Sequence, residues 1–383
     1  MEALTEQAAA AGAAAQAATL GITIGSKLLY GSISQLWGLI NGLSLFVHLP
    51  LTGVDIPDKT LAVLGELIKV AQFDMIDNVD AYGAAIPFME EDDEQLEVID
   101  NFVTTGYESS YAFVNMGTNV IILTLLFFFM TLLLVLYPCR KGQGRTGRFH
   151  RYCSGTIYWN FWLRMLIQGC LEIGISAMMY ITHRQELVDL ADGSFSSFFV
   201  VNDFLSFFFS LLLFIVLPLF VIVFYCTRFK KLGDKDFKDK YGAVYDSLRT
   251  DRRSILFFPF FFLARRYNFT LMAFWLSDRP SLFIFVLVLM TMIEAVYLFT
   301  FVPFETKLMQ NLEVFNEITS FILLYIALGF TDFISDGDLE DDLGWVFNGI
   351  MGVNICVHFY FMIRSTCSDI KKKCKERKAK KRL

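Results

Sequence analysis

Five charged residues lie inside long apolar stretches and are the first candidates for chemistry. They are Arg164, Glu172, Arg265, Arg266 and Glu294. A charged side chain in the bilayer interior costs several kcal/mol and persists where it is paired or lines a polar path. The pattern therefore indicates a pathway for ions or lipid phosphate, or a gating network of ion pairs. In the plainer alternative, Glu294 and one of the two neighbouring arginines lock two helices, while Arg164 extends toward the headgroups.

The predicted helical hairpin at residues 254–303 organises these charges. Each arm has the roughly 20 apolar residues that are needed to cross a hydrocarbon core of about 30 Å. At about 1.5 Å per residue, Arg266 and Glu294 lie about 18–20 Å from the turn, so the two are predicted to face each other. Arg164 and Arg265 fall at a similar depth, in the inner half of the membrane. No span has arginine at every third position, which excludes a voltage sensor.

An acidic cluster is predicted between the last two spans, at an outer mouth. It consists of Asp336, Asp338, Glu340, Asp341 and Asp342. Such a cluster can concentrate cations, and Ca²⁺ is a weak possibility. The spacing is not that of an EF-hand loop, so a solvated turn is favoured and no metal site is assigned. The connection is also too short for a pore helix with a selectivity filter.

A basic C-terminal tail is the strongest candidate for binding anionic inner-leaflet lipids. Its residues are Lys371, Lys372, Lys373, Lys375, Arg377 and Lys378. Each basic residue near such a surface contributes about 1 kcal/mol. The segment 227–254 mixes nine basic residues with aromatic ones and is compatible with an interfacial helix, or with a role in orientation alone. Candidates for S-acylation are Cys139, Cys153, Cys226, Cys367 and Cys374. A nucleic-acid partner is not expected beside a membrane.

Composition excludes an ordinary soluble domain, and the motifs do not favour an enzyme. The 383 residues are 55% hydrophobic and only 19% charged, with 41 Phe. The four His are scattered, and no hydrolase, metalloprotease or nucleotide-binding pattern is present. We therefore predict neither catalysis nor a cofactor.

The predicted fold is an all-α polytopic membrane bundle of about seven spans. They are 112–137, 156–182, 200–226, 255–277, 281–302, 314–332 and 343–364. The chain divides into membrane-associated N-terminal helices (1–50), an acidic extracytoplasmic segment with an amphipathic helix (51–112), the bundle (113–365) and the basic tail (366–383). The bias of Lys and Arg among the loops predicts that the C-terminus is cytoplasmic.

Two details of the spans stay open at this point. The uncharged stretch Leu28–Pro50 is either an eighth span or a surface helix with Trp37 and His48 at the interface. In the third span, Pro218 predicts a kink with a freed carbonyl that another group could use.

The order of several short motifs resembles a known family. They are QLWGLIN at 35–41, FD at 73–74, KYGAVY at 240–245, LARR at 263–266, PF at 303–304 and NLEVFNE at 311–317. Together they resemble the C-terminal multi-pass region of large cysteine-rich surface proteins of ciliates. That region is similar to the transient-receptor-potential-like (TRP-like) membrane domain of fungal flavin-carrier proteins. The resemblance covers about residues 25–365, without the cysteine-rich ectodomain.

The resemblance implies a plasma-membrane or ciliary protein of TRP-like type, compatible with a homo-oligomer. Cation conduction or a channel-related sensor is the leading hypothesis, with Arg265, Arg266 and Glu294 as its coupled core. The alternatives are a non-conducting scaffold that recruits partners and anionic lipid, and a transporter of lipid or solute.

Overall fold

The computed structural model describes most of the chain from residue 38 to residue 380. The described residues are 38–39, 42–71, 102, 105–107, 109–116, 128–138, 144, 146–147, 150, 162–190, 197–234, 237–238, 241–245, 247–331, 333–334 and 336–380. Regular structure in these ranges is helical, without a strand, which confirms the all-α class there. The chain forms two compact units, residues 1–73 with 276–383 (unit 1) and residues 74–275 (unit 2).

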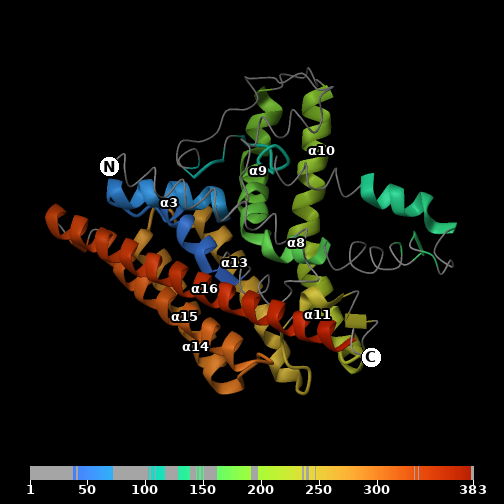
Figure 1. Cartoon of the computed structure of the whole chain (residues 1–383). Helices are drawn as coiled ribbons and strands as arrows, with labels where there is room; N and C mark the ends of the chain where they lie inside the picture. The colour runs from blue at the N-terminus through green and yellow to red at the C-terminus, as the bar shows by residue number, and fades with distance from the viewer. Residues whose placement is uncertain are drawn as a thin grey trace. The chain divides into compact units, whose positions relative to one another are not determined.

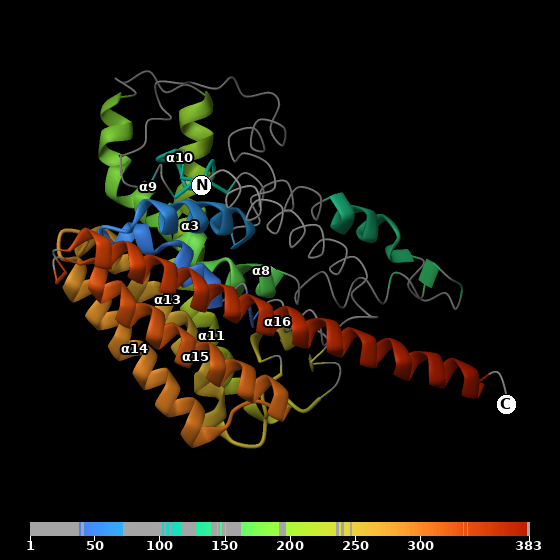
Figure 2. The same ribbon diagram turned by 60° about the vertical axis from the view of Figure 1, so that its left-hand side comes forward.

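Unit 1 is built on a layer of three long helices. In chain order its elements are η1 (Leu49–Thr52), α3 (Asp58–Ala71), α14 (Pro280–Phe301), α15 (Lys307–Ala327), η9 (Leu328–Phe330) and α16 (Gly337–Lys380). The helix α15 packs against both α14 and α16, and α3 packs on α16 (Figures 1 and 2). The core of this unit therefore lies along α15 and the first two thirds of α16.

The α14–α15 hairpin is closed by local polar contacts. Proline at position 280 fits the first turn of α14, and Val302 ends that helix in a left-handed conformation (φ 45°). The hydroxyl of Thr306 accepts the backbone N–H of Met309 at 3.3 Å and caps α15. Gln310 donates to the carbonyl of Leu298 at 2.9 Å, so the last turn of α14 is tied to the first turn of α15.

A short buried helix precedes α3 and fills the core of unit 1. Residues 43–49 are all buried, and Phe46 meets Phe347 of α16 edge to face with ring centroids 6.3 Å apart. The His48 side chain is 1% exposed, and its Nδ1 lies 2.6 Å from the carbonyl oxygen of Ser44. Protein atoms thus cover His48, which the surface-helix alternative had placed at the interface. Trp37 lies outside the described residues, and spanning by 28–50 stays a prediction.

Unit 2 is organised around α9, which packs against α10 and α13. Its elements are α8 (Trp162–Gln168), α9 (Cys170–Leu190), α10 (Ser197–Leu211), η5 (Leu212–Val216), α11 (Leu217–Arg228), η6 (Phe229–Lys231), η7 (Gly242–Val244), η8 (Arg253–Phe257) and α13 (Phe258–Trp275). Figure 1 shows α9 and α10 side by side, with α8 turned away from α9. The bend at Gly169 interrupts the stretch that was predicted as a continuous second span.

The kink expected at Pro218 is present as a π-helical turn. In η5 the backbone N–H of Leu217 bonds to the carbonyl of Leu212, five residues back. In this register the carbonyl of Leu213 would accept from residue 218, and proline has no N–H to donate. The hydroxyl of Tyr267 in α13 donates to that carbonyl at 2.8 Å instead. The prediction of a freed and reused carbonyl is therefore confirmed.

Four helices in the described ranges are long and apolar enough to cross a bilayer. They are Val200–Lys231, Pro280–Phe301, Lys307–Phe330 and Gly337–Ser368. They match the third, fifth, sixth and seventh predicted spans and indicate a membrane protein. The core of the first predicted span, residues 117–127, lies outside the described residues. The count of seven and the orientation stay predictions.

Candidate functional site

The predicted charged layer is divided between the two units. In unit 2, Arg265 and Arg266 are 7% and 2% exposed and Glu172 is 9% exposed, whereas Arg164 is half-buried on α8. In unit 1, Glu294 is 2% exposed on α14. These buried charges confirm none of the proposed roles by themselves. The pairing of Glu294 with an arginine joins residues of different units and stays a prediction.

Within unit 2, Arg266 has a local environment of its own. Its guanidinium carbon lies 3.5 Å from the centre of the Phe262 ring, and Nη1 donates to the Phe262 carbonyl at 3.4 Å. A cation over an aromatic face is stabilised by the ring quadrupole, more strongly where water is excluded. The aromatic residue one turn earlier in α13 therefore helps to keep this arginine inside the protein.

A polar network of three side chains lies between α15 and α16 and is the best-defined site in unit 1. The Oδ1 of Asn316 lies 2.6 Å from Nε2 of His358 and accepts the amide N–H of Asn354 at 3.2 Å. All three side chains are less than 7% exposed. Because Asn316 is the acceptor, the proton of the imidazole is assigned to Nε2. One amide oxygen therefore joins two donors that lie one helical turn apart on α16.

Two glycines bring the N-terminal helix close to this network. A Cβ on Gly42 would lie 3.7 Å from the Asn316 amide, and one on Gly38 would lie 3.8 Å from the His358 ring. The two glycines are four residues apart, in the described helical residues 38–39 and 42–47. Small residues at this spacing let helix backbones approach closely inside membranes. The network is therefore enclosed on the side of this helix as well.

Further buried polar side chains continue from the network along α14 and α15. They are Thr291, Glu294, Gln310, Glu317, Thr319 and Ser320, each at most 8% exposed. The outward residues of these helices are apolar, for example Ile293, Val296 and Ile318, with exposures of 56%, 64% and 46%. The outer face of unit 1 is thus apolar at these positions, and its interior combines the buried polar side chains with apolar ones such as Leu287, Leu323 and Phe347. Polar residues inside spans are costly and mark functional positions by default.

The acidic cluster belongs to the start of α16 rather than to a free loop. The Asp336 carboxylate accepts the backbone N–H of Asp338 at 3.2 Å. Acidic residues in the first turns complement the helix dipole. Asp341 pairs with Lys59 of α3 at 2.7 Å, which raises the pKa of the lysine. In the described ranges no group of three or more His, Cys, Asp or Glu side chains is arranged to hold a metal ion.

The basic tail is the continuation of the same helix. Residues 366–380 extend α16 without a break, and Lys371 and Lys375 are exposed. These two lysines are four residues apart and so lie on one helix face. Lipid binding by this face stays a prediction.

The sequence pointed to charges and missed the neutral polar partners. Asn316 was noted only within a motif, and His358 only as one of four scattered histidines. A signal was available in the spacing of Asn354 and His358, which places both on one face of the last span. The partner on α15 could not be read from that spacing.

Comparisons with protein families, with characterised proteins and with solved structures found no match to this chain.

Proposed function

We propose that this chain is a multi-pass membrane protein of TRP-like type that conducts cations or senses a stimulus as such channels do. The proposal rests on one observation, the set of buried polar side chains on α14, α15 and α16, helices whose outer faces are apolar. Neutral amide oxygens and a carboxylate can replace part of a cation's hydration shell. The motif order described above supports the TRP-like assignment. Catalysis is no part of the proposal.

The buried carboxylate Glu294 and the amide of Asn316 are the groups that we propose to matter for conduction. A cation that passes through unit 1 would need oxygen ligands, which the Glu294 carboxylate can supply. The Asn316 oxygen already accepts from His358 and Asn354, so it would bind the ion in exchange for one of these hydrogen bonds. Removing the charge of Glu294 should therefore change flux, whereas removing the Asn316 oxygen should also destabilise unit 1, so its flux is compared at equal amounts of folded protein.

Cation flux into proteoliposomes tests the proposal. The purified chain is reconstituted, and K⁺, Na⁺ and Ca²⁺ uptake is measured for the parent, Glu294→Gln and Asn316→Leu. Glu305→Gln and Asn311→Leu are the matched controls, because both residues are exposed. We expect uptake by the parent and the controls, and a several-fold change in rate or ion preference in the two buried variants.

Two results would overturn the conduction proposal. The first is an absence of uptake by the parent, across all three cations and a range of imposed potentials. The second is uptake that is identical in all variants once protein incorporation is equalised. Transfer of labelled lipid without cation uptake would assign the chain to the transporter alternative. Loss of expression alone in the buried variants would favour a scaffold.

A further inference from the structure

A groove along α11 combines an apolar wall with a basic end. Its volume is about 670 Å³, and it belongs to unit 2 alone. Its lining includes Val216, Leu219, Val223 and Arg228 of the η5–α11 helix. Phe237 and Tyr241, from the basic segment 227–254, line it as well. Pockets of about 300–1,000 Å³ are typical of small-molecule and cofactor sites.

The basic segment folds back onto α11 and forms one wall of this groove. Phe224 of α11 stacks on Phe237 with ring centroids 5.5 Å apart and meets Tyr241 at 5.7 Å. The hydroxyl of Tyr225 donates to the carbonyl of Val244 at 2.9 Å, which fixes the returning chain. The interfacial helix predicted over 227–254 is therefore replaced, in its described parts, by short helical turns packed on α11. Aromatic contacts and the Tyr225 hydrogen bond together hold this wall against α11.

The other wall of the groove is formed by apolar side chains of α11 that are exposed on the surface of the protein. Leu219 and Val223 are 55% and 54% exposed, although both belong to a helix that is apolar enough to cross a bilayer. From residue 216 to Arg228 the groove follows α11 for about 18 Å at 1.5 Å per residue. This length matches the roughly 15 Å depth of one leaflet of a 30 Å hydrocarbon core. An acyl chain fits such a groove, whereas a water-soluble ligand would leave its apolar wall exposed.

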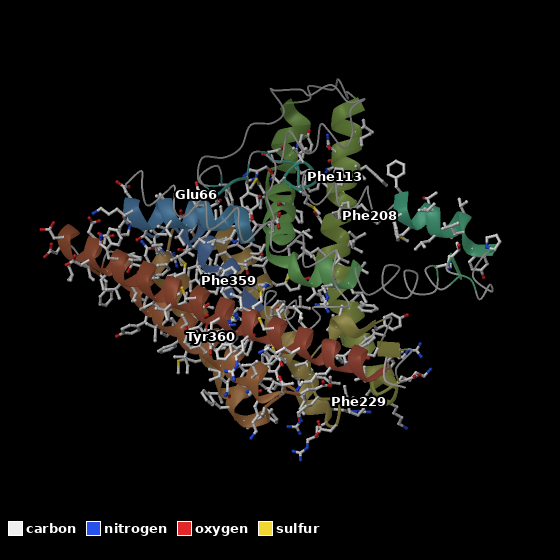
Figure 3. The ribbon with its side chains drawn as sticks, in the orientation of Figure 1. Glu66, Phe113, Phe208, Phe229, Phe359 and Tyr360 are labelled. Carbon is white, nitrogen blue, oxygen red and sulfur yellow. The ribbon has the colours of Figure 1, made fainter. Side chains whose placement is uncertain are left out.

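The open end of the groove is positively charged. Arg228 is exposed in the last turn of α11, and η6 adds Lys230 and Lys231 directly after it. Phe229, labelled in Figure 3, lies at this end, and the guanidinium carbon of Arg253 is 5.4 Å from the centre of its ring. The sequence from 227 to 254 holds nine basic and five acidic residues. An occupant with an anionic headgroup is therefore favoured over a zwitterionic one.

We propose that this groove binds one anionic phospholipid, with an acyl chain along Val216, Leu219 and Val223 and the phosphate against Arg228. The chain is held by burial of apolar surface, and the headgroup by charge-assisted hydrogen bonds to the guanidinium. The site is distinct from the basic tail on α16, and it requires neither conduction nor any stimulus.

Lipid titration of the purified full-length chain in detergent micelles tests the proposal. The probes are phosphatidylserine and phosphatidylcholine that carry the same fluorescent acyl chain. We expect Arg228→Gln to weaken phosphatidylserine binding about fivefold, which corresponds to about 1 kcal/mol per basic residue at a membrane surface. Arg279→Gln, the same change in an exposed turn outside the groove, should leave binding unchanged. Phosphatidylcholine should bind more weakly and respond little to either change.

A second pair of variants tests the acyl-chain wall. Leu219→Trp fills the groove and should reduce binding of both probes, whereas Leu282→Trp on the exposed face of α14 should not. A photoactivatable acyl chain should label the peptide 216–228. Equal binding by the parent and Arg228→Gln, or unchanged binding in Leu219→Trp, would overturn the proposal. Labelling confined to the tail of α16 would also overturn it.

Discussion

Replacing Asn316 by alanine should destabilise unit 1 far more than the same change at an exposed site. The substitution removes the oxygen that accepts from both His358 and Asn354. Hydrogen bonds between helices in bilayers contribute about 0.6 kcal/mol on average and at most about 1.7. A buried donor that is left without an acceptor costs about 1–3 kcal/mol. For two donors we expect a loss of about 2–6 kcal/mol.

The assay is thermal unfolding of the purified protein in detergent, with Asn311→Ala as the matched control. Asn311 lies on the same helix, five residues earlier, and is exposed. At roughly 2–4 °C per kcal/mol, Asn316→Ala should lower the midpoint by about 4–24 °C, and the control should change it little. A double-mutant cycle with His358→Ala should give a coupling energy of about 0.6–1.7 kcal/mol.

Either of two results would refute this reasoning. One is an Asn316→Ala midpoint equal to that of Asn311→Ala, which would mean that the amide oxygen carries no net stabilisation. The other is a coupling energy near zero in the cycle, which would mean that the 2.6 Å contact is not a hydrogen bond in the membrane protein. In that event the three polar side chains would have to be explained separately.

Two further predictions concern the contact of α3 with α16. Gly344→Ala should destabilise the protein by about 1–3 kcal/mol, because the new Cβ would lie 2.7 Å from the buried Thr60 hydroxyl. Gly349→Ala, at a position with open space around it, should stabilise the protein by about 0.5–1 kcal/mol. Equal thermal midpoints for the two variants would contradict this. The pKa of Lys59 is raised by its hydrogen bond to Asp341, so its stabilising contribution should be present below pH 10.5 and lost as the pH rises further. The midpoint difference between the parent and Lys59→Met should therefore shrink at high pH and at high salt, and a difference that grows would contradict the assignment.

Apolar length and proline chemistry predicted much of the described fold. The four apolar helices lie where continuous apolar runs were found, because a run of that length has few alternatives to a membrane helix. Pro218 predicted the distortion of the third span, since a missing N–H must free a carbonyl. The partner hydroxyl, from Tyr267, could not be predicted because it lies 54 residues from Leu213 along the chain.

Other features depend on tertiary contacts that a local pattern does not encode. The bend at Gly169 occurs in a stretch whose composition suits one helix, and it separates α8 from α9. The Asn316–His358 contact joins residues 42 positions apart, and each residue alone is compatible with many partners. The sequence also divided bundle from tail at residue 365, whereas α16 passes through that point as one helix.

The unbroken course of α16 has a mechanical consequence. Its 44 residues make a rod about 66 Å long, more than twice the thickness of the hydrocarbon core. Figure 2 shows it continuing past the ends of α14 and α15. Since no loop interrupts it, we expect a displacement of its lysine-bearing end to be transmitted along the helix to Asn354 and His358.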